Sequence, residues 1–348
     1  MTQGVLCCGP DGGAFRYHTR GIGRAFEAIG IPFADWDGQN IELIRQLQPR
    51  IYIACSEAWR WNYPAWARHE YGTKVLIHVN PYGTVKVGSI DRGPIIDAKP
   101  RDIKWVAAQR PDGVFCYADR RTVDTYFNSW RSQHSYKIYP FSLAADHCAL
   151  SGAEYRDELA FDVGWVGGIW PYKAVMMNKY LIPLRQKHRC GFYGWNDPWR
   201  MGPISDQDVK HLYRSAKICP SVSESHTVHH PIDMPQRVYN VACAGGFTIH
   251  TPTPCLERLG LSDVIPMAHN EAEWFDMIQY YLDHDEERME RAARQKEAIL
   301  RNHTYLHRIT DWVKDFFPEK LTELEQAQSS LLASDAPQSF GAIAERPI

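Results

Sequence analysis

The sequence predicts an α/β protein in which two doubly wound domains, each built on a parallel sheet, face each other across a cleft. Short apolar runs alternate with segments of helical spacing along most of the chain, and this alternation is typical of parallel sheets covered by helices. The 348 residues are also more than one hydrophobic core usually organises, so two consecutive domains are expected. In such proteins ligands bind beyond the carboxyl ends of the strands.

Expected strands and helices alternate along the first half of the chain. A short apolar strand at 4–8 precedes a glycine-rich turn at 9–13, and a helix is expected over 19–29, where Ile22, Phe26 and Ile29 recur at helical spacing. Because the chain turns polar around 143–158, we place the N-terminal domain at residues 1–150. Its further strands are expected at 32–35, 51–55, 74–79, 113–117 and 136–140, with helices between them, one of which covers 119–130.

The second half repeats the alternation, and we place the C-terminal domain at residues 151–305. A last helix is expected within 306–328, over 312–328, and the small and polar residues of 329–348 indicate a disordered tail. The second domain's strands are expected at 161–168, 190–193, 217–221, 247–250 and 263–267, and its helices at 206–215, from 236 onward, at 271–284 and at 286–302.

One stretch of the second half contains residues suited to binding a ligand: DMPQRVYNVACAGGFTIHT at 233–251. Asp233 is placed to accept early helix amides while Gln236 reaches back, as in a capping box. Arg237 and Asn240 are three residues apart and share a helix face. A helix start that carries an arginine attracts anions, which points to a phosphate-bearing ligand. The small residues at 242–246 allow the end of the helix to pack closely against another backbone.

Composition narrows the class of protein. The formal net charge of −2 gives no whole-chain case for binding nucleic acid or an anionic membrane. No apolar run reaches the roughly 18 residues of a membrane span, and the first residues lack the apolar core of a signal peptide. The nine cysteines show no paired C-x-x-C spacing, so we expect reduced thiols in a cytoplasmic protein.

Six motifs of the second half occur in the order and spacing of a known family. They are DVGWVGGIWPYK (162–173), FYGWNDPW (192–199), ISDQDVKHLYRSAKICPSVS (204–223), QRVYNVACAGGFTIHT (236–251), YYLDHDEERMERAARQ (280–295) and NHTYLHRI (302–309). With these motifs, the half resembles the C-terminal domain of two-Rossmann-domain glycosyltransferases of the group-1 superfamily, which have the GT-B architecture. Among them it is most similar to the spore-maturation-protein-like (CgeB-type) members.

The resemblance implies that the C-terminal domain holds a nucleotide-diphosphate sugar, a UDP- or GDP-sugar, as donor substrate. The turn Gly167-Gly168 would approach the diphosphate, and Lys173 and Arg237 match basic residues that contact phosphate. Asn240 stands where many relatives have a glutamate that binds the ribose hydroxyls, and Gly168 stands where many have an arginine. Glu224 is a further candidate for contacting the sugar or its nucleotide, with a helix cap as the alternative.

Positive charge at the diphosphate stabilises the departing nucleoside diphosphate in the transition state. If a lysine, an arginine and a helix N-terminus supply that charge, no metal or other cofactor is required. The histidines at 226, 229, 230 and 250 could contact the donor. A zinc site there is disfavoured, because no cysteine pairs with this run at ligand spacing.

The N-terminal domain would hold the acceptor. Asp11, in the glycine-rich turn, and His18 are candidates for the general base that takes a proton from an acceptor hydroxyl. The alternative is that Asp11 forms the turn and His18 lines the first helix. The acceptor is a small molecule, a glycan or modified DNA.

Tryptophans and basic residues crowd the stretch 59–104, and aromatic and arginine side chains can stack on bases. This stretch could accept DNA with a hydroxymethylated base, or it could simply pack its tryptophans into the N-terminal core. Two other classes stay open: a non-catalytic protein that binds sugar nucleotides or acts as a scaffold on the same fold, and a nucleotide-sugar epimerase.

Overall fold

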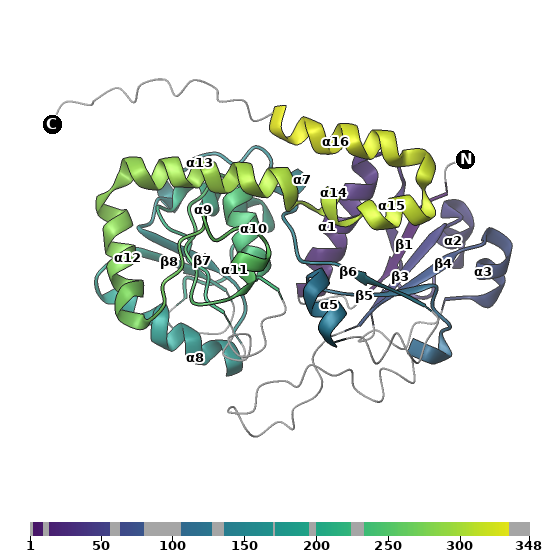
Figure 1. The fold of residues 1–348 in the computed structure, drawn as a ribbon, viewed down its shortest axis with the longest axis horizontal. Coiled ribbons are helices and arrows are strands. Elements are labelled where there is room, and N and C mark those ends of the chain that lie inside the picture. The colour runs from purple at the N-terminus through teal and green to yellow at the C-terminus, as the bar shows by residue number, and fades with distance from the viewer. Residues whose placement is uncertain are drawn as a thin grey trace.

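The computed structural model describes residues 3–9, 14–55, 63–79, 106–126, 136–169, 171–194, 200–223 and 233–333. The described residues form two α/β halves, each with a parallel sheet (Figure 1). The α/β class and the two doubly wound units expected from the sequence are confirmed. No described helix is long and apolar enough to cross a membrane.

The first half contains a six-stranded parallel sheet in the order β2-β1-β3-β4-β5-β6. Strand β2 is added on one side of β1, and β3 to β6 follow on its other side. Such a switch beside the first strand is typical of doubly wound folds. The strands are β1 (Val5–Cys8), β2 (Phe33–Asp35), β3 (Ile51–Cys55), β4 (Lys74–His78), β5 (Gly113–Cys116) and β6 (Lys137–Pro140). The described helices of this half include α1 (Ala14–Ala28), α2 (Ile41–Leu47), α3 (Ala65–Tyr71) and α5 (Arg120–Tyr126).

The second half is centred on β7 (Val163–Val166) and β8 (Cys190–Tyr193), which pair in parallel. The other three expected strands are present as single parallel bridges, Val163 to Ile218, Ser221 to His250 and His250 to Met267, rather than as full ladders. Its helices are α7 (His147–Leu150), α8 (Pro171–Tyr180), α9 (Asp206–Ser215), α10 (Gln236–Cys243), α11 (Cys255–Arg258), α12 (Glu271–Asp283) and α13 (Asp285–Asn302), with 3-10 turns at Asp157–Leu159 and Ile182–Gln186.

The chain then returns to the first half through α14 (Tyr305–Arg308) and α15 (Thr310–Phe316). The expected single helix over 312–328 is wrong: Phe317 leaves helical geometry (φ −137°, ψ 52°) before Pro318, and a 3-10 turn, η4 (Pro318–Lys320), leads into α16 (Leu321–Ala333). A proline disfavours helical backbone at the residue before it. The start of the expected tail, 329–333, is helical, and 334–348 lie outside the described residues.

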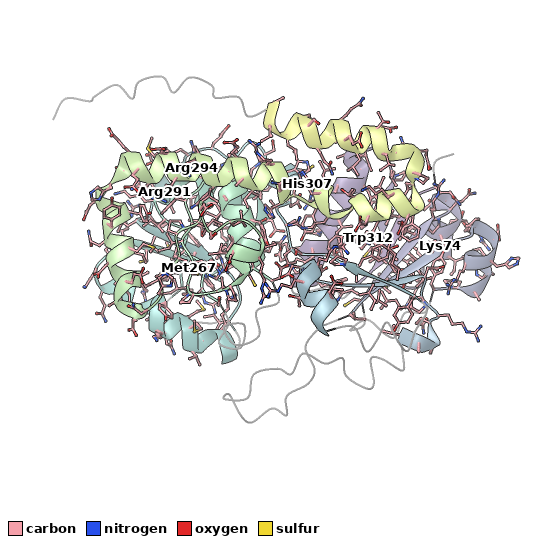
Figure 2. All side chains as sticks on the ribbon, viewed as in Figure 1. Lys74, Met267, Arg291, Arg294, His307 and Trp312 are labelled. Carbon is pink, nitrogen blue, oxygen red and sulfur yellow. The ribbon has the colours of Figure 1, made fainter. Side chains whose placement is uncertain are left out.

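The returning helices complete the apolar core of the first half. Trp312 has no exposed side-chain surface, and its ring centroid lies 4.6 Å from that of Phe141 and 4.9 Å from that of Phe115. Figure 2 places Trp312 over the N-terminal sheet, whereas Arg291 and Arg294 lie on α13 of the other half. The first sheet is therefore covered by residues from the far end of the described chain.

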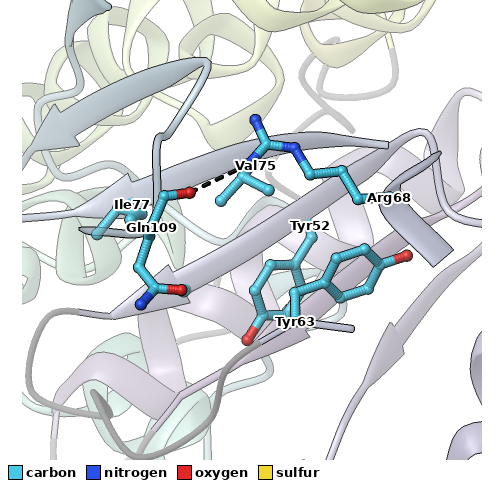
Figure 3. Close-up of a pocket in the computed structure, with 7 residues that line it drawn as sticks. Tyr52, Tyr63, Arg68, Val75, Ile77 and Gln109 are labelled. Carbon is cyan, nitrogen blue, oxygen red and sulfur yellow. Dashed lines mark hydrogen bonds between the residues drawn. The ribbon is translucent and has the colours of Figure 1, made fainter. Parts of the chain in front are cut away.

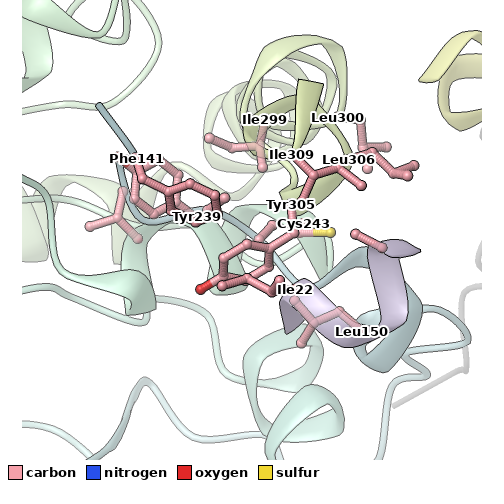
Figure 4. Packing of buried hydrophobic residues seen from close by; sticks show 14 of the residues in the cluster. Ile22, Phe141, Leu150, Tyr239, Cys243, Ile299, Leu300, Tyr305, Leu306 and Ile309 are labelled. Carbon is pink, nitrogen blue, oxygen red and sulfur yellow. The ribbon is translucent and has the colours of Figure 1, made fainter. Parts of the chain in front are cut away.

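One apolar cluster runs through both halves (Figure 4). Tyr305, which is fully buried, lies in it between Ile22 of α1 and Tyr239 of α10. Gly21 makes this packing possible, because a Cβ there would lie 2.3 Å from the Tyr305 ring. Helix α1 can therefore approach Tyr305 of α14 this closely only because residue 21 has no side chain.

The two connections between the halves lie side by side. Ala145 and Thr304 form a parallel bridge, and Arg308 donates to the carbonyls of Ser142 and Leu143 on the first connection, at 2.9 and 3.2 Å. Arg24 adds a bidentate ion pair to Asp146. The two connections are therefore tied to each other where the halves join.

We expect Gly21→Ala to destabilise the protein by about 1–3 kcal/mol, as overpacking does, although alanine normally stabilises a helix by about 1 kcal/mol over glycine. Urea unfolding measures the change. In a Tyr305→Ala background, where the clashing ring is gone, the same substitution should be neutral or stabilising. Equal effects of Gly21→Ala in both backgrounds would contradict the packing described here.

Candidate functional site

The carboxyl end of β7 brings together the residues expected to bind the donor diphosphate. Arg237, in the first turn of α10, is 9 % exposed and donates through Nε and Nη2 to the carbonyl of Val166, at 3.1 and 2.7 Å. Its guanidinium carbon lies 4.6 Å from the centre of the Trp165 ring. Hydrogen bonds and cation–π contact thus fix the position of this charge.

Gly167 lies directly against that guanidinium. A Cβ at Gly167 would be 2.5 Å from Nη2 of Arg237 and 3.1 Å from the Trp165 ring, so any side chain here would displace the arginine. Gly168 is exposed beside it. Arg237 therefore leaves no space for a side chain at position 167, in the turn expected to approach a diphosphate.

Two more cations belong to this cluster. Lys173, at the start of α8, is buried, with Nζ 5.9 Å from the centre of the Trp165 ring. Arg200 donates from Nη1 to the carbonyl of Gly167 at 3.0 Å, and it is a residue that the sequence analysis missed. Its only sequence signal is its place just after the motif FYGWNDPW. We call Lys173, Arg200 and Arg237 the cation cluster.

The expected capping box at the start of α10 is wrong. Pro235 is the N-cap residue and makes no side-chain cap, and Gln236 donates to the hydroxyl of Tyr305 at 3.2 Å. Asp233 instead accepts hydrogen bonds from the amide of Leu143 and the hydroxyl of Tyr239. Burial raises the pKa of Asp233 to about 7. Tertiary contacts to the connection between the halves have replaced the local cap.

The small residues at the end of α10 do allow a close approach. A Cβ at Gly246 would lie 2.0 Å from the carbonyl oxygen of Tyr213, and Gly245 has a φ of +79°. Both glycines are therefore required where α10 turns into the next strand. This expectation is confirmed.

Asn240 lies one turn beyond Arg237 on α10. It is partly buried, and its Oδ1 has no hydrogen-bond partner among the described residues. The same holds for Nε2 of His250 and the hydroxyl of Ser221, both fully buried where two strand segments of the second sheet meet. The pKa of His250 is lowered to about 4, chiefly by burial. Glu224 lies outside the described residues.

Of the two expected bases in the first half, Asp11 lies outside the described residues. His18 lies in the first turns of α1, is 7 % exposed, and packs its ring edge-on against Tyr117, with centroids 4.5 Å apart. Burial lowers the pKa of His18 to about 3. The imidazole is therefore neutral at physiological pH.

The carboxyl edges of the two sheets meet. Tyr17, after β1, donates to Asp206, after β8, at 3.2 Å, and Arg20 lies 3.7 Å from the same carboxylate. Asp119, after β5, lies 3.9 Å from Arg258 of α11. Segments that follow strands in one half thus contact the other half, so the cation cluster and His18 belong to edges that face a common region.

Other candidates are not assembled by the structure. Most of the aromatic and basic stretch 59–104 and the histidines at 226, 229 and 230 lie outside the described residues. Within the described ranges, no three His, Cys, Asp or Glu side chains are close enough to share a metal ion. All nine cysteines are free thiols, most of them buried.

Two cavities lie away from the meeting edges. One, of about 30 Å³, lies in the first half between Tyr52, Tyr63, Arg68 and Gln109 (Figure 3). It has room for about two or three water molecules, much less than a sugar needs. The other, of about 200 Å³, borders the connection between the halves at Ser142, His307 and Arg308.

Comparison with known proteins shows the same architecture. Residues 177–314 match a family model described as glycosyl transferase-like, whereas no curated protein matches the chain. Sucrose-phosphate synthase from Thermosynechococcus elongatus superposes with a TM-score of 0.58 at 10 % identity, over 95 % of this chain and 100 % of that one.

A T4 phage protein and an Anabaena protein also share the fold. The T4 phage β-glucosyltransferase in complex with UDP-glucose gives a TM-score of 0.55 at 10 % identity, over 96 % of this chain and 100 % of that one. The Anabaena protein HepE in complex with UDP gives 0.53 at 11 % identity, over 95 % and 100 %. The chain therefore has the two-domain GT-B fold, and its second half contains a glycosyltransferase-like domain.

Proposed function

We propose that this protein is a glycosyltransferase that moves a sugar from a nucleotide-diphosphate sugar to a hydroxyl acceptor. The observation that carries the proposal is the cation cluster: Arg237, Lys173 and Arg200 converge from three segments on the Trp165–Gly167 turn. Charges held in advance at the end of a strand stabilise a leaving diphosphate without reorganising during the reaction. The glycosyltransferase-like domain spans much of the same half.

Each donor-side residue then has a role. Arg237 and Lys173, with the N-terminus of α10, neutralise the diphosphate, and Arg200 positions the carbonyl and turn of Gly167, beside Gly168. Asn240 offers an amide oxygen to a ribose hydroxyl, and Glu224 contacts the sugar or its nucleotide. This arrangement acts without an obligate metal. The donor is a UDP- or GDP-sugar, as in the neighbours that bind UDP-glucose or UDP.

The acceptor belongs to the first half. We propose residues 1–150 as the acceptor domain, 151–305 as the donor domain and 306–328 as the helical segment that joins the last part of the chain to the first. Asp11 or His18 is the base for the acceptor hydroxyl. Closure of the two halves excludes water and limits donor hydrolysis. The free thiols suit a cytoplasmic enzyme.

Arg237→Gln should reduce release of nucleoside diphosphate from the preferred nucleotide sugar by about 10–100-fold, because one charge-assisted contact is worth about 1.5–3 kcal/mol. The measurement uses a panel of UDP- and GDP-sugars. Arg294→Gln is the matched control, since Arg294 is exposed on α13, in a different part of the second half (Figure 2).

The same assay separates the alternatives. Binding of nucleotide sugars without release would identify a non-catalytic sugar-nucleotide-binding or scaffold protein, and an isomerised sugar nucleotide would identify an epimerase. Equal release by the wild type and Arg237→Gln would show that the cation cluster is not the donor site.

Hydroxymethylated DNA is the acceptor that we would test first among large molecules. The aromatic and basic stretch 59–104 belongs to the sequence of the proposed acceptor domain, and a T4 phage DNA-modifying glucosyltransferase shares the fold. If DNA is the acceptor, modified duplex should accelerate nucleoside diphosphate release, and its binding should weaken steeply with salt. Unmodified duplex is the control. No binding at low salt would exclude this acceptor.

A further inference from the structure

Three polar side chains meet at the carboxyl edge of the first sheet. Tyr117 follows β5, His78 ends β4, and His18 lies on α1. The ring centroid of Tyr117 lies 4.4 Å from that of His78 and 4.5 Å from that of His18. Three separate elements thus bring two imidazoles and a phenol into contact. We call these residues the His–His–Tyr cluster.

Each of the three has a buried polar atom without a hydrogen bond. Within the described part of the chain, Nδ1 of His18, Nε2 of His78 and the hydroxyl of Tyr117 have no partner. Both histidines are only 7 % exposed. One buried polar group without a hydrogen bond destabilises a protein by about 1–3 kcal/mol, and such groups are rare. Three such atoms on residues in contact, none with a partner among the described residues, point to a bound ligand.

The chemistry of the cluster selects a neutral, hydroxyl-bearing ligand. Burial lowers the pKa of both histidines to about 3, so their free nitrogens offer neutral donor or acceptor atoms. Phe15 adds an apolar ring, 5.2 Å from His78, and Cys55 Sγ lies 3.7 Å from His78 Nδ1. None of these groups carries a charge that would attract a phosphate. Hydroxyls can both donate and accept, and the carbon face of a sugar ring suits aromatic walls.

We propose that His18, His78 and Tyr117 form a subsite for the hydroxyl groups of a sugar ring, on the edge that meets the donor-binding half. The proposal rests on the proposed function and extends it from His18 to His78 and Tyr117. The ring belongs either to the transferred sugar of the donor or to a sugar-like acceptor. In both cases the ligand satisfies the three atoms that have no partner among the described residues.

The matched variants are Tyr117→Phe and His78→Phe, which keep an aromatic ring and remove only the polar atoms. Because the Tyr117 hydroxyl has no hydrogen bond to a described residue, ligand-free Tyr117→Phe should melt at the wild-type temperature or above it. His78→Phe also removes the contact of Nδ1 with Cys55 Sγ, so only its ligand binding is compared. A lower melting temperature of Tyr117→Phe would show that its hydroxyl is bonded within the protein and would overturn the proposal.

Calorimetric titration with UDP-glucose and GDP-mannose, each compared with bare UDP and GDP, tests the donor arm. If the subsite binds the donor's sugar, each variant should weaken the binding of the nucleotide sugar about 3–10-fold, the value of one hydrogen bond. The affinity for the bare nucleotide should stay unchanged.

Release of nucleoside diphosphate with and without glucose, methyl glucoside or hydroxymethylated DNA tests the acceptor arm. An acceptor subsite predicts unchanged donor affinity and a loss of acceptor-stimulated release.

Variants that match the wild type in both arms would overturn the subsite and leave the proposed function standing. A wild type that binds none of these nucleotides or nucleotide sugars would instead contradict the proposed function and this inference together. Arg237→Gln distinguishes the two sites, because it should weaken the bare nucleotides as well.

Discussion

The packing around Tyr305 and Trp312 is the constraint on which the rest of this structure depends. Both side chains are fully buried, and their neighbours come from α1, the strand edge at Phe141 and the second half. Because one apolar cluster joins the halves, segments that follow strands of the two sheets are held in contact, as Asp206 with Tyr17 and Asp119 with Arg258 show. A site that needs residues from both sheets can then be assembled without a large conformational search.

On the donor side, two residues of one short sequence motif, Trp165 and Gly167, fix the positions of the cations. Trp165 is buried at the end of a strand and supplies an aromatic face to Lys173 and Arg237. Gly167 gives Arg237 the space to donate to Val166. The arginine is therefore held by the strand that precedes the turn, so its charge and the backbone that would face a phosphate move as one unit. On the opposite sheet, the His–His–Tyr cluster is neutral, which fits a division between a charged and an uncharged part of the substrate.

Much of the fold could be predicted from the sequence because apolar periodicity reflects burial directly. The strands of the first sheet and the close approach at Gly246 are examples. The errors arose where tertiary contacts decide. Asp233 looked like a local cap but bonds the connection at Leu143, and one expected helix is broken before Pro318. Arg200 was missed because only folding brings it to Gly167. The roles of the site residues and the residue boundaries of the domains stay predictions.

The return of α15 and α16 to the first half has a consequence for the order in which the chain acquires structure during synthesis. Trp312, Phe317 and Leu324 belong to the cluster that also buries Phe26 and Phe115. The first sheet is translated early, but these partners are translated more than 150 residues after the end of β6. A domain at the start of a chain normally folds first on the ribosome. Here the first half can complete its core only after residues 312–324 have been made, whereas one core of the second half lies within residues 163–292.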